Sequence, residues 1–311
     1  METILISGGS GLIGSAITDL LINRGFNVII LTRNKKKYND SQHVKYAEWD
    51  PYRKNIDVTV FNEADHLIHL AGEGVADKRW TQKRKKEIID SRVNTAHFLA
   101  TCLTKYPNKI KSVIAASAIG WYGPDPMVPN PNPFHESAPS NDDFLGTTCR
   151  KWENALHEFE VLNKRLVILR TGIVLSKNGG AYPQFKKCVG PGVTTILGSG
   201  RQMISWVHVD DLASMYAYVL SSSSLAGVYN AVAPNPVSNE QLIREIESIK
   251  NRKQVKLHIP EFILKVALGE LSIEVLKSCT VSSAKITATG FQFKYPAIQD
   301  AVQELESTKS N

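Results

Sequence analysis

Short runs of apolar, often β-branched residues alternate with longer segments of helical periodicity over the first two-thirds of the chain. The runs are predicted to be strands: residues 3–7, 27–31, 44–49, 65–71, 112–116, 166–170 and 206–209. The segments between several of them repeat apolar residues every three or four positions and are predicted to be helices: residues 12–23, 82–104, 147–162 and 212–220. Such alternation is typical of a parallel sheet covered by helices on both faces. The pattern therefore predicts a doubly wound α/β fold.

Two stretches rich in proline or glycine interrupt this alternation. Residues 124–139 contain six prolines and are predicted to form a loop over the sheet. Residues 179–200 are predicted to contribute to a substrate cleft. Two further helices are predicted in a smaller unit that follows: residues 239–250 and 260–268. We therefore predict a first domain over residues 1–234 and a small C-terminal α/β substrate domain over residues 235–311.

Composition narrows the class of protein. The chain has 311 residues, of which 42% are hydrophobic and 22% charged, as in a folded globular protein and unlike a disordered one. Its apolar runs are all far shorter than the roughly 20 residues that a membrane helix needs. The N-terminus lacks the basic segment of a signal peptide. We therefore expect a cytoplasmic protein without a membrane partner.

The net charge of +7 raises the question of a nucleic-acid partner. The densest basic cluster, Lys83-Arg84-Lys85-Lys86, lies in a predicted helix and is accompanied by no recognised nucleic-acid motif. We interpret it as a solvated helix face and expect no nucleic-acid partner. A basic surface would also attract a phosphorylated cofactor or an acidic substrate.

Cysteines and histidines do not form a metal-binding pattern. The four cysteines lie far apart in the sequence and include no CxxC pair. Among the eight histidines only His66 and His69 are close neighbours, and their odd separation on a strand points them to opposite faces. No metal site is predicted.

A glycine-rich loop joins the first predicted strand to the first predicted helix. It reads Gly8-Gly9-Ser10-Gly11-Leu12-Ile13-Gly14. Without side chains the backbone can turn tightly and approach a pyrophosphate, and the helix N-terminus then faces the negative charge. Strand, loop, helix and second strand fall within about thirty residues, as a dinucleotide-binding unit requires. The loop predicts dinucleotide binding, and the alternative is a glycine-rich turn that binds nothing.

The residues at the end of the second predicted strand indicate which dinucleotide the protein binds. An NAD enzyme usually has a carboxylate here for the ribose 2′-hydroxyl, whereas a basic residue accommodates a 2′-phosphate. This chain has Thr32-Arg33, followed by Lys35, Lys36 and Lys37. The sequence therefore favours NADP(H) over NAD(H). The three lysines are also compatible with a solvated loop, so only Arg33 is singled out.

The sequence resembles the extended short-chain dehydrogenase/reductases of the NAD-dependent epimerase/dehydratase type, which have an NAD(P)-binding Rossmann fold. Four motifs carry this resemblance: residues 8–14, Leu70-Ala71-Gly72, Ser117 with Trp121-Tyr122-Gly123, and residues 206–212. A second set is similar to one branch, the epimerase family proteins with a short C-terminal domain, some of which are labelled cell division inhibitors. This set includes Arg79-Trp80, Ser91-Arg92, Trp152-Glu153, Arg170-Thr171-Gly172, Ala233-Pro234-Asn235-Pro236 and Thr289-Gly290-Phe291.

The resemblance implies roles for particular residues around the cofactor. Gly8, Ser10, Gly11, Leu12 and Ile13 would line the pyrophosphate, with Gly14 completing the loop, and Thr32 and Arg33 would face the adenosine ribose. The remaining candidates beside the cofactor are Leu70, Ala71, Gly72, Glu87, Arg92 and, near the nicotinamide, Val174. For Glu87 a surface salt bridge is an equal alternative. The resemblance also implies a small-molecule substrate and a possible homodimer formed through helices such as residues 82–104.

The catalytic pattern of the family is missing. Its reductases use a Tyr hydroxyl as acid/base and a Lys four residues later, on the same helix face, that lowers the pKa of the Tyr. A Glu commonly follows the Tyr by eight residues, and anchoring on Glu153 places Leu145 and Cys149 at the Tyr and Lys positions. The one literal YxxxK, Tyr182 to Lys186, follows the sixth predicted strand instead of preceding it. We interpret it as a chance match.

Other polar residues are candidates for the missing acid/base. Ser117 ends the fifth predicted strand, and Tyr122 follows it, with packing beneath the proline-rich loop as the alternative for Tyr122. Cys149 is a candidate for lining the nicotinamide pocket, or a small core residue. His208 and Asp210 are expected to be structural, with Asp210 or Asp211 capping the following helix.

Two hypotheses of function follow from the sequence. The first is an NADP(H)-dependent oxidoreductase or epimerase that transfers hydride at a carbonyl or alcohol of an unknown small molecule. The second is a non-catalytic NADP(H)-binding sensor or interaction module, which the residues at positions 145 and 149 favour. Screening NADPH oxidation against a panel of carbonyl compounds distinguishes them.

Overall fold

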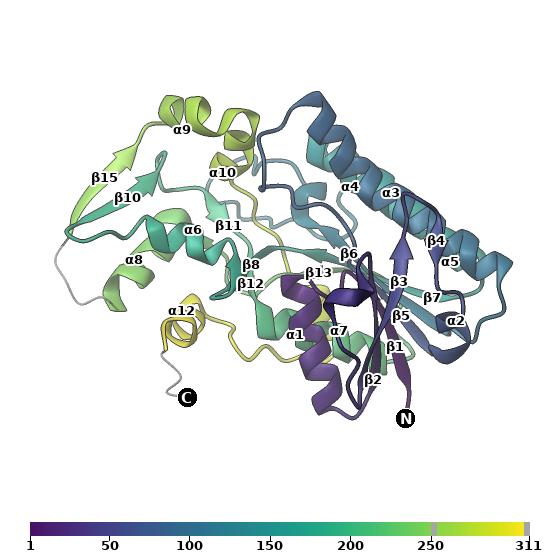
Figure 1. Cartoon of the computed structure of the whole chain (residues 1–311). Coiled ribbons are helices and arrows are strands. Elements are labelled where there is room, and N and C mark those ends of the chain that lie inside the picture. The colour runs from purple at the N-terminus through teal and green to yellow at the C-terminus, as the bar shows by residue number, and fades with distance from the viewer. Residues whose placement is uncertain (250–253, 308–311) are drawn as a thin grey trace.

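The computed structural model describes residues 1–249 and 254–307, and its centre is an eight-stranded sheet in the order β13-β7-β6-β5-β1-β2-β3-β4 (Figure 1). The strands are β1 (Thr3–Ser7), β2 (Asn27–Thr32), β3 (Val44–Asp50), β4 (Asn55–Ile56), β5 (His66–His69), β6 (Ser112–Ala118), β7 (Arg165–Thr171) and β13 (Gly227–Ala231). All pairs are parallel except β3 with β4. The strand order reverses between β1 and β5, and open α/β sheets bind ligands at the carboxyl ends of such strands.

Helices cover both faces of this sheet. They are α1 (Leu12–Asn23), α2 (Val60–Glu63), α3 (Gln82–Lys105), α4 (Phe144–Leu156), α5 (Glu158–Val161) and α7 (Val209–Ser221). Because successive strand residues point to opposite faces, β1 contributes to two cores. Leu5 packs with residues of α3 and α4, whereas Ile4 and Ile6 pack with residues of α1 and α7. The predicted doubly wound fold is therefore confirmed.

Two details of the prediction are wrong. The run at residues 206–209 forms β12 (Trp206–His208), which belongs to a separate sheet with β8 (Ile173–Ser176) and β9 (Gly179–Gly180). The main sheet is completed by β13 instead, a short edge strand that starts with a glycine and contains the polar Asn230, so it lacks the apolar run of the other strands. The helix predicted over residues 147–162 starts earlier, because the Asp143 side chain caps α4, and it is divided at His157 into α4 and α5.

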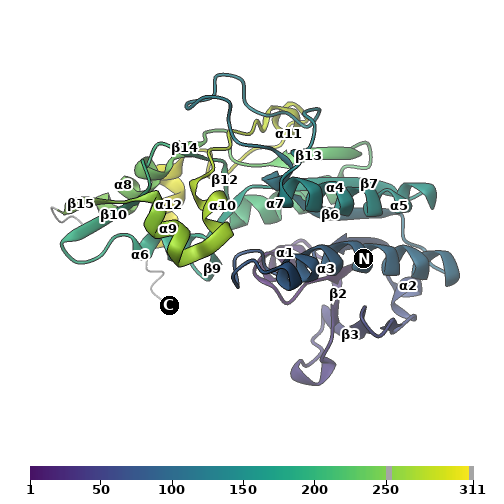
Figure 2. The same ribbon diagram turned by 90° about the horizontal axis from the view of Figure 1, so that it is seen from above.

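The remaining elements form a smaller unit at one end of the sheet, on the left in Figures 1 and 2. They are α6 (Tyr182–Lys187), β10 (Val193–Leu197), β11 (Met203–Ile204), β14 (Val237–Ser238), α8 (Asn239–Ile249), β15 (Val255–Ile259), α9 (Glu261–Leu268), α10 (Ser272–Leu276) and α12 (Ile298–Glu306). One further helix, α11 (Ala284–Ala288), lies instead beside β13, and its Ile286 packs in the core of the main sheet (Figure 2). The predicted end of α8, Lys250, lies outside the described residues. The core of this unit joins Tyr182 and Trp206 to Leu242 and Val302, so it uses residues on both sides of position 234.

The proline-rich stretch at residues 124–139 contains neither helix nor extended strand, as predicted. Asp125 ties its start to the C-terminal unit by accepting hydrogen bonds from Ser278 Oγ at 2.7 Å and from Thr280 N at 2.9 Å. Phe134 forms an isolated bridge with Val281. The loop therefore links the two units on the side of β6. None of the described helices is both long enough and apolar enough to cross a bilayer.

His69 at the end of β5 makes the stability of this fold depend on pH. Its ring is fully buried, its Nδ1 lies 2.6 Å from Ser7 Oγ, and burial lowers its pKa from 6.5 to about 4. Between these two pH values the unfolded chain binds a proton that the folded protein excludes, so stability falls as the pH falls. When the pH is lowered from 7 to 4.5, the free energy of unfolding should fall in both proteins. We expect the fall to be about 2 to 3 kcal/mol smaller in His69→Gln than in the wild type. Urea unfolding at both pH values measures this, with His43→Gln as the control, and equal losses would contradict it.

Candidate functional site

The loop between β1 and α1 has the geometry of a phosphate cradle. Gly8 has a φ of 78°, and Gly11 N donates to Gly8 O at 3.1 Å, which closes a tight turn. A Cβ at Gly14 would lie against Gly8 O and only 2.6 Å from the Gly9 Cα. The first turn of α1 has neither a side-chain cap nor an acidic residue. The helix therefore presents free backbone N–H groups and a positive dipole end.

The end of β5 passes directly beside this cradle. A Cβ at Gly8 would lie 3.0 Å from the Leu70 carbonyl carbon and 3.0 Å from Ala71 N. Leu70 N donates to Ser7 O at 2.9 Å, which continues the β1–β5 ladder to the sheet edge. The structure thus brings the predicted residues Leu70 and Ala71 together with the glycine loop.

Unpaired positive charge lies at the carboxyl end of β2. Thr32 is buried and its Oγ1 accepts from Asn34 N at 3.3 Å, whereas Arg33 points into solvent. Lys35, Lys36 and Lys37 follow as an exposed single 3-10 turn. Across residues 1–249 and 254–307, the side chains of these four cations form no hydrogen bond or ion pair. Their charge is therefore available to a phosphate.

Arg92 lies across the next part of the sheet edge. A Cβ at Gly72 would stand 3.2 Å from its guanidinium carbon, and that carbon lies 5.0 Å from the centre of the Trp152 ring. Its Nη1 donates to Ile88 O at 3.0 Å, and burial lowers its pKa. The structure thus places two predicted residues, Gly72 and Arg92, in contact.

Glu87 is held by Arg84 and does not reach this edge freely. The Arg84 guanidinium is buried and contacts Glu73 at 3.1 Å and Glu87 at 3.2 Å, and it donates to Gly74 O at 2.7 Å. The salt bridge considered for Glu87 is therefore formed. Arg84 itself fixes the loop after β5, a role that the sequence did not reveal because the residue belongs to a basic run.

Val174 on β8 completes the set of predicted cofactor residues. Its carbonyl oxygen accepts from Ala181 N at 3.4 Å and would lie 3.0 Å from a Cβ at Gly180. The same glycine faces Leu12, whose Cδ2 would be 3.2 Å from that Cβ. Val174 and Leu12 are thus joined through Gly180, beside the start of α1.

Both candidate hydroxyls for acid/base chemistry are buried and occupied. Ser117 Oγ donates to Glu153 Oε1 at 2.6 Å. Tyr122 OH donates to Asn230 Oδ1 at 2.7 Å and accepts from Arg170 Nη1 at 3.0 Å, and its ring stacks on Phe134 of the proline-rich loop. Burial raises the pKa of Tyr122 to about 12. Tyr122 therefore packs beneath the proline-rich loop, which was the alternative to an acid/base role. Both hydroxyls are engaged in hydrogen bonds within the protein.

Leu145 and Cys149 lie on the face of α4 toward the turn after β6. A Cβ at Gly120, in the turn after β6, would lie 3.1 Å from Leu145 Cβ and 3.6 Å from Cys149 Sγ. Cys149 Sγ donates to Ala118 O at 3.6 Å, and burial raises the pKa of this thiol to about 12. Leu145 and Cys149 therefore occupy one helix face beside the end of β6, where the resemblance places the Tyr and Lys.

Two other sequence candidates are structural. Tyr182 OH donates to Glu306 Oε1 at 2.8 Å, and Lys186 Nζ lies 2.9 Å from the same carboxylate, so this YxxxK joins α6 to α12. His208 is itself the N-cap of α7, because its Nδ1 accepts from Asp210 N at 3.2 Å. The expectation that Asp210 or Asp211 caps the helix is wrong, since Asp211 instead accepts backbone hydrogen bonds from residues 294 and 295.

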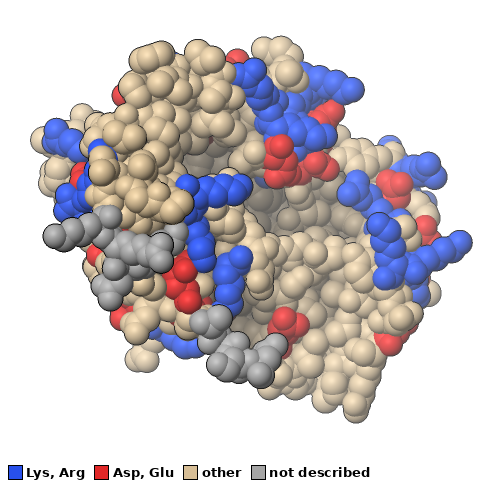
Figure 3. All heavy atoms as spheres, turned by 60° about the vertical axis from the view of Figure 1, so that its left-hand side comes forward, with Lys and Arg blue, Asp and Glu red and all other residues tan. Residues whose placement is uncertain are grey.

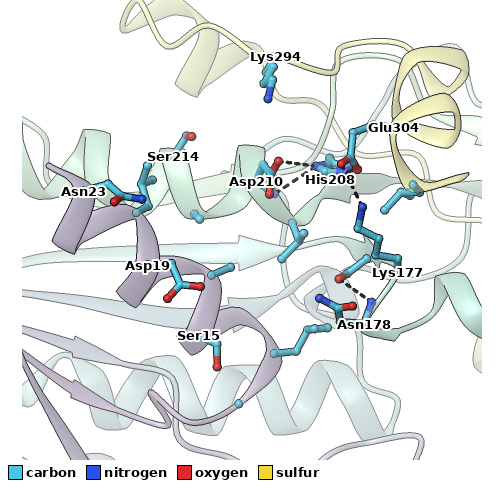
Figure 4. A pocket seen from close by; sticks show the side chains of 18 of the residues that line it. Ser15, Asp19, Asn23, Lys177, Asn178, His208, Asp210, Ser214, Lys294 and Glu304 are labelled. Atoms are coloured by element: carbon cyan, nitrogen blue, oxygen red, sulfur yellow. Dashed lines mark hydrogen bonds and ion pairs between the residues drawn. The ribbon is translucent and has the colours of Figure 1, made fainter. Parts of the chain in front are cut away.

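A cavity of about 880 Å³ opens on the flank of α1. It begins at Ser10 and Gly11 and continues between α1, α7 and α12, with Asp19, Lys177 and Glu304 projecting into it (Figure 4). It therefore shares the first turn of α1 with the cradle but leads away from β2 and β5.

The fold and these glycines agree with the comparisons to known proteins. Residues 4–231 match the NAD dependent epimerase/dehydratase family. The chain belongs to this family. Residues 259–305 match a domain of unknown function, DUF1731, and this range runs from α9 into α12. The sequence predicted a short C-terminal domain in addition to the Rossmann fold, and this match confirms it.

Individual relatives cover nearly the whole chain. Epimerase family protein YfhF of Bacillus subtilis is 33% identical over 97% of this chain and 97% of its own length. The chloroplastic SDR39U1 homolog of Arabidopsis thaliana is 31% identical over 97% of this chain and 86% of its own. The crystal structure of human epimerase family protein SDR39U1 with NADPH has a TM-score of 0.82 and 26% identity, covering 97% of this chain and 98% of that one. A UDP-glucose 4-epimerase from Thermus thermophilus, at 18% identity and a TM-score of 0.77, shares the fold.

Proposed function

We propose that the protein binds NADP(H) and transfers hydride between the nicotinamide and a carbonyl or alcohol carbon of a small molecule. The observation that carries this proposal is the joint presence, at one sheet edge, of the glycine cradle and the unpaired cations after β2. The cradle fits a pyrophosphate, because Gly8 and Gly14 leave no room for a Cβ and the loop ends in an uncapped helix. The cations fit a 2′-phosphate. The human relative, whose structure contains NADPH, supports the same cofactor.

The residues that would hold the cofactor follow from this geometry. Backbone N–H groups of residues 8–13 would bind the pyrophosphate, and Thr32 and Arg33 the adenosine ribose and its phosphate. Leu70, Ala71, Gly72 and Arg92 would follow it along the edge toward Val174. The reduced nicotinamide supplies the hydride when it is bound. Lysine and arginine side chains stand beside the hollow in the face drawn in Figure 3, together with acidic side chains on the same rim.

Binding of the two reduced nucleotides tests the choice of cofactor. We expect NADPH to bind at least about tenfold more tightly than NADH, because only NADPH carries the phosphate that Arg33 would contact. Arg33→Ala should abolish this preference and leave the far-ultraviolet circular dichroism unchanged. Arg24→Ala removes an exposed arginine at the far end of α1 and should keep the preference. Isothermal titration calorimetry measures each affinity, and equal wild-type affinities would refute the role of Arg33.

The second candidate function is a non-catalytic NADP(H)-binding module. Leu145 and Cys149 favour it, because a leucine and a neutral thiol face the turn after β6. The two functions separate when NADPH oxidation is followed at 340 nm with aldehydes, ketones and vicinal diketones. Turnover of any of these supports the enzyme, whereas tight NADPH binding without turnover of the whole panel supports the module.

A further inference from the structure

The C-terminal unit holds a sheltered lysine–glutamate pair at the end of α10. Lys277 Nζ lies 2.7 Å from Glu274 Oε2, and the two side chains are only 7% and 19% exposed. Burying an ion pair costs several kcal/mol per ion in lost hydration, so such pairs are not general stabilisers. Placed away from a site, this pair would be an ordinary helix-end contact. Its surroundings therefore decide what it can do.

These surroundings belong to the carboxyl end of β6. Lys277 Nζ donates to Tyr122 O at 3.4 Å, at the end of the turn that follows β6. Burial raises the pKa of Glu274, and Asp143, the N-cap of α4, lies close enough for its charge to act in the same direction. Leu145 comes two residues after this N-cap. The pair thus lies near the end of β6 and the start of α4, where Leu145 and Cys149 occupy the positions of the family's Tyr and Lys.

Contacts from the other side of the sheet edge hold the segment in place. Arg79 Nη2 donates to Val266 O of α9, and Lys85 pairs with Glu270, just before α10. Lys85 Nζ also lies 5.2 Å from the centre of the Phe144 ring, next to Leu145. The α9–α10 segment therefore spans from the C-terminal unit to the starts of α3 and α4 (Figure 1). This holds Lys277 beside the turn after β6 and close to the start of α4.

We propose that Lys277 is the proton donor of the reaction and that Glu274 positions its ammonium group. This inference rests on the proposed function. In the reduction of a carbonyl, the substrate carbon accepts a hydride from the reduced nicotinamide, and the substrate oxygen takes a proton from Lys277 Nζ. The products are an alcohol, the oxidised nucleotide and a neutral amine, which regains its proton from solvent. The oxidation of an alcohol uses the reverse steps.

The neighbouring groups leave this task to Lys277. The hydroxyls of Ser117 and Tyr122 are bonded to Glu153, Arg170 and Asn230, and Cys149 is a neutral buried thiol. The Lys277 ammonium has three N–H donors, and Glu274 and Tyr122 O account for two of them. The ammonium pairs with Glu274 on its own segment and lies near Cys279. Asp143 at the start of α4 lies near Glu274, and Asp125 in the proline-rich loop lies near Cys279.

The structure of the complex with NADPH gives the first test, and it requires no known substrate. One carbonyl group must fit between nicotinamide C4 and the proton donor, so the distance from C4 to Lys277 Nζ should be within about 7 Å. A longer distance, or a Lys277 ammonium facing away from the nicotinamide, would overturn the inference even if NADPH is bound as proposed.

Kinetics with a vicinal diketone, 9,10-phenanthrenequinone, give the second test. Lys277→Met should lower kcat by about 100-fold while the Kd for NADPH stays within twofold. Lys277→Arg keeps the ion pair but cannot release a proton near neutral pH, so it should also lose about 100-fold. A purely structural lysine would be rescued by arginine.

Two controls separate the possible failures. Lys285→Met removes another lysine of the C-terminal unit, which donates to Val228 O, and should leave kcat unchanged. Glu274→Gln combined with Lys277→Met removes both charges, so that a folding defect of the single variant can be recognised. Full activity of Lys277→Met, with normal NADPH binding, would refute the role of Lys277 alone. Absence of NADPH binding to the folded wild type would refute the proposed function instead.

Discussion

Replacing Gly14 by alanine is expected to lower the free energy of unfolding by about 3 kcal/mol or more. The added Cβ would lie against Gly8 O, 2.6 Å from the Gly9 Cα and 2.8 Å from the Gly9 carbonyl carbon. All three atoms belong to the backbone, so no side-chain rotation relieves the overlap. The loop between β1 and α1 must move away from the helix, and its N–H groups move with it. NADPH affinity should therefore fall by about 100-fold as well.

Gly11→Ala serves as the matched control for stability. Gly11 has a φ of −82°, which any residue adopts, and a Cβ there would meet only Gly8 O at 3.3 Å. We expect its unfolding free energy to stay within about 1 kcal/mol of the wild type. Urea denaturation followed by circular dichroism compares the two variants, and calorimetry gives their NADPH affinities. A Gly14→Ala protein as stable as Gly11→Ala would show that the loop is not the tight cradle described above.

The sequence predicts the main sheet well because its information is local. Buried parallel strands are short apolar runs, and β1, β2, β3, β6 and β7 are found within two residues of their predicted bounds. The edge strand β13 was not predicted, because it starts with a glycine and contains the polar Asn230. The side chain of Asn230 accepts a hydrogen bond from Tyr122, which is distant in the sequence. Likewise, nothing local places Trp206 in a separate sheet. Its indole donates to Asn235 O in the C-terminal unit.

The cofactor side of the candidate site could be predicted for the same reason, whereas the reacting side could not. The glycine loop comes directly after β1, and Arg33 comes directly after β2. Their residue types and positions along the chain were enough to predict contacts with a dinucleotide. The occupancy of the Ser117 and Tyr122 hydroxyls depends on Glu153, Arg170 and Asn230, which come from three other elements. Lys277 reaches the end of β6 from 155 positions away. Such proximity is a property of packing, and no spacing in the sequence records it.

Removing one partner of the Arg170–Glu153 ion pair should cost about 3 to 5 kcal/mol of unfolding free energy. Both side chains are almost completely buried, and two bonds of 2.8 Å join Arg170 Nε and Nη2 to the two carboxylate oxygens. Arg170 also stacks 3.7 Å from the centre of the Trp121 ring. Arg170→Met leaves the Glu153 carboxylate buried without its partner, and Glu153→Leu leaves the guanidinium in the same state. Both variants should unfold at distinctly lower urea concentration.

The double variant and an exposed pair show what this ion pair does. Arg170→Met with Glu153→Leu should lose less stability than the two single variants added together, because neither charge is then left alone. Arg150 lies on the same helix as Glu153 and forms a solvent-exposed ion pair with Asp142. Arg150→Met breaks this pair and should lower the free energy of unfolding by less than about 1 kcal/mol. Since Glu153 lies two turns after Leu145, the buried pair also sets the rotation of α4 against β6 and β7. A stable double variant should therefore lose NADPH affinity or turnover through a shifted α4, and an unchanged double variant would show that the rotation is fixed elsewhere.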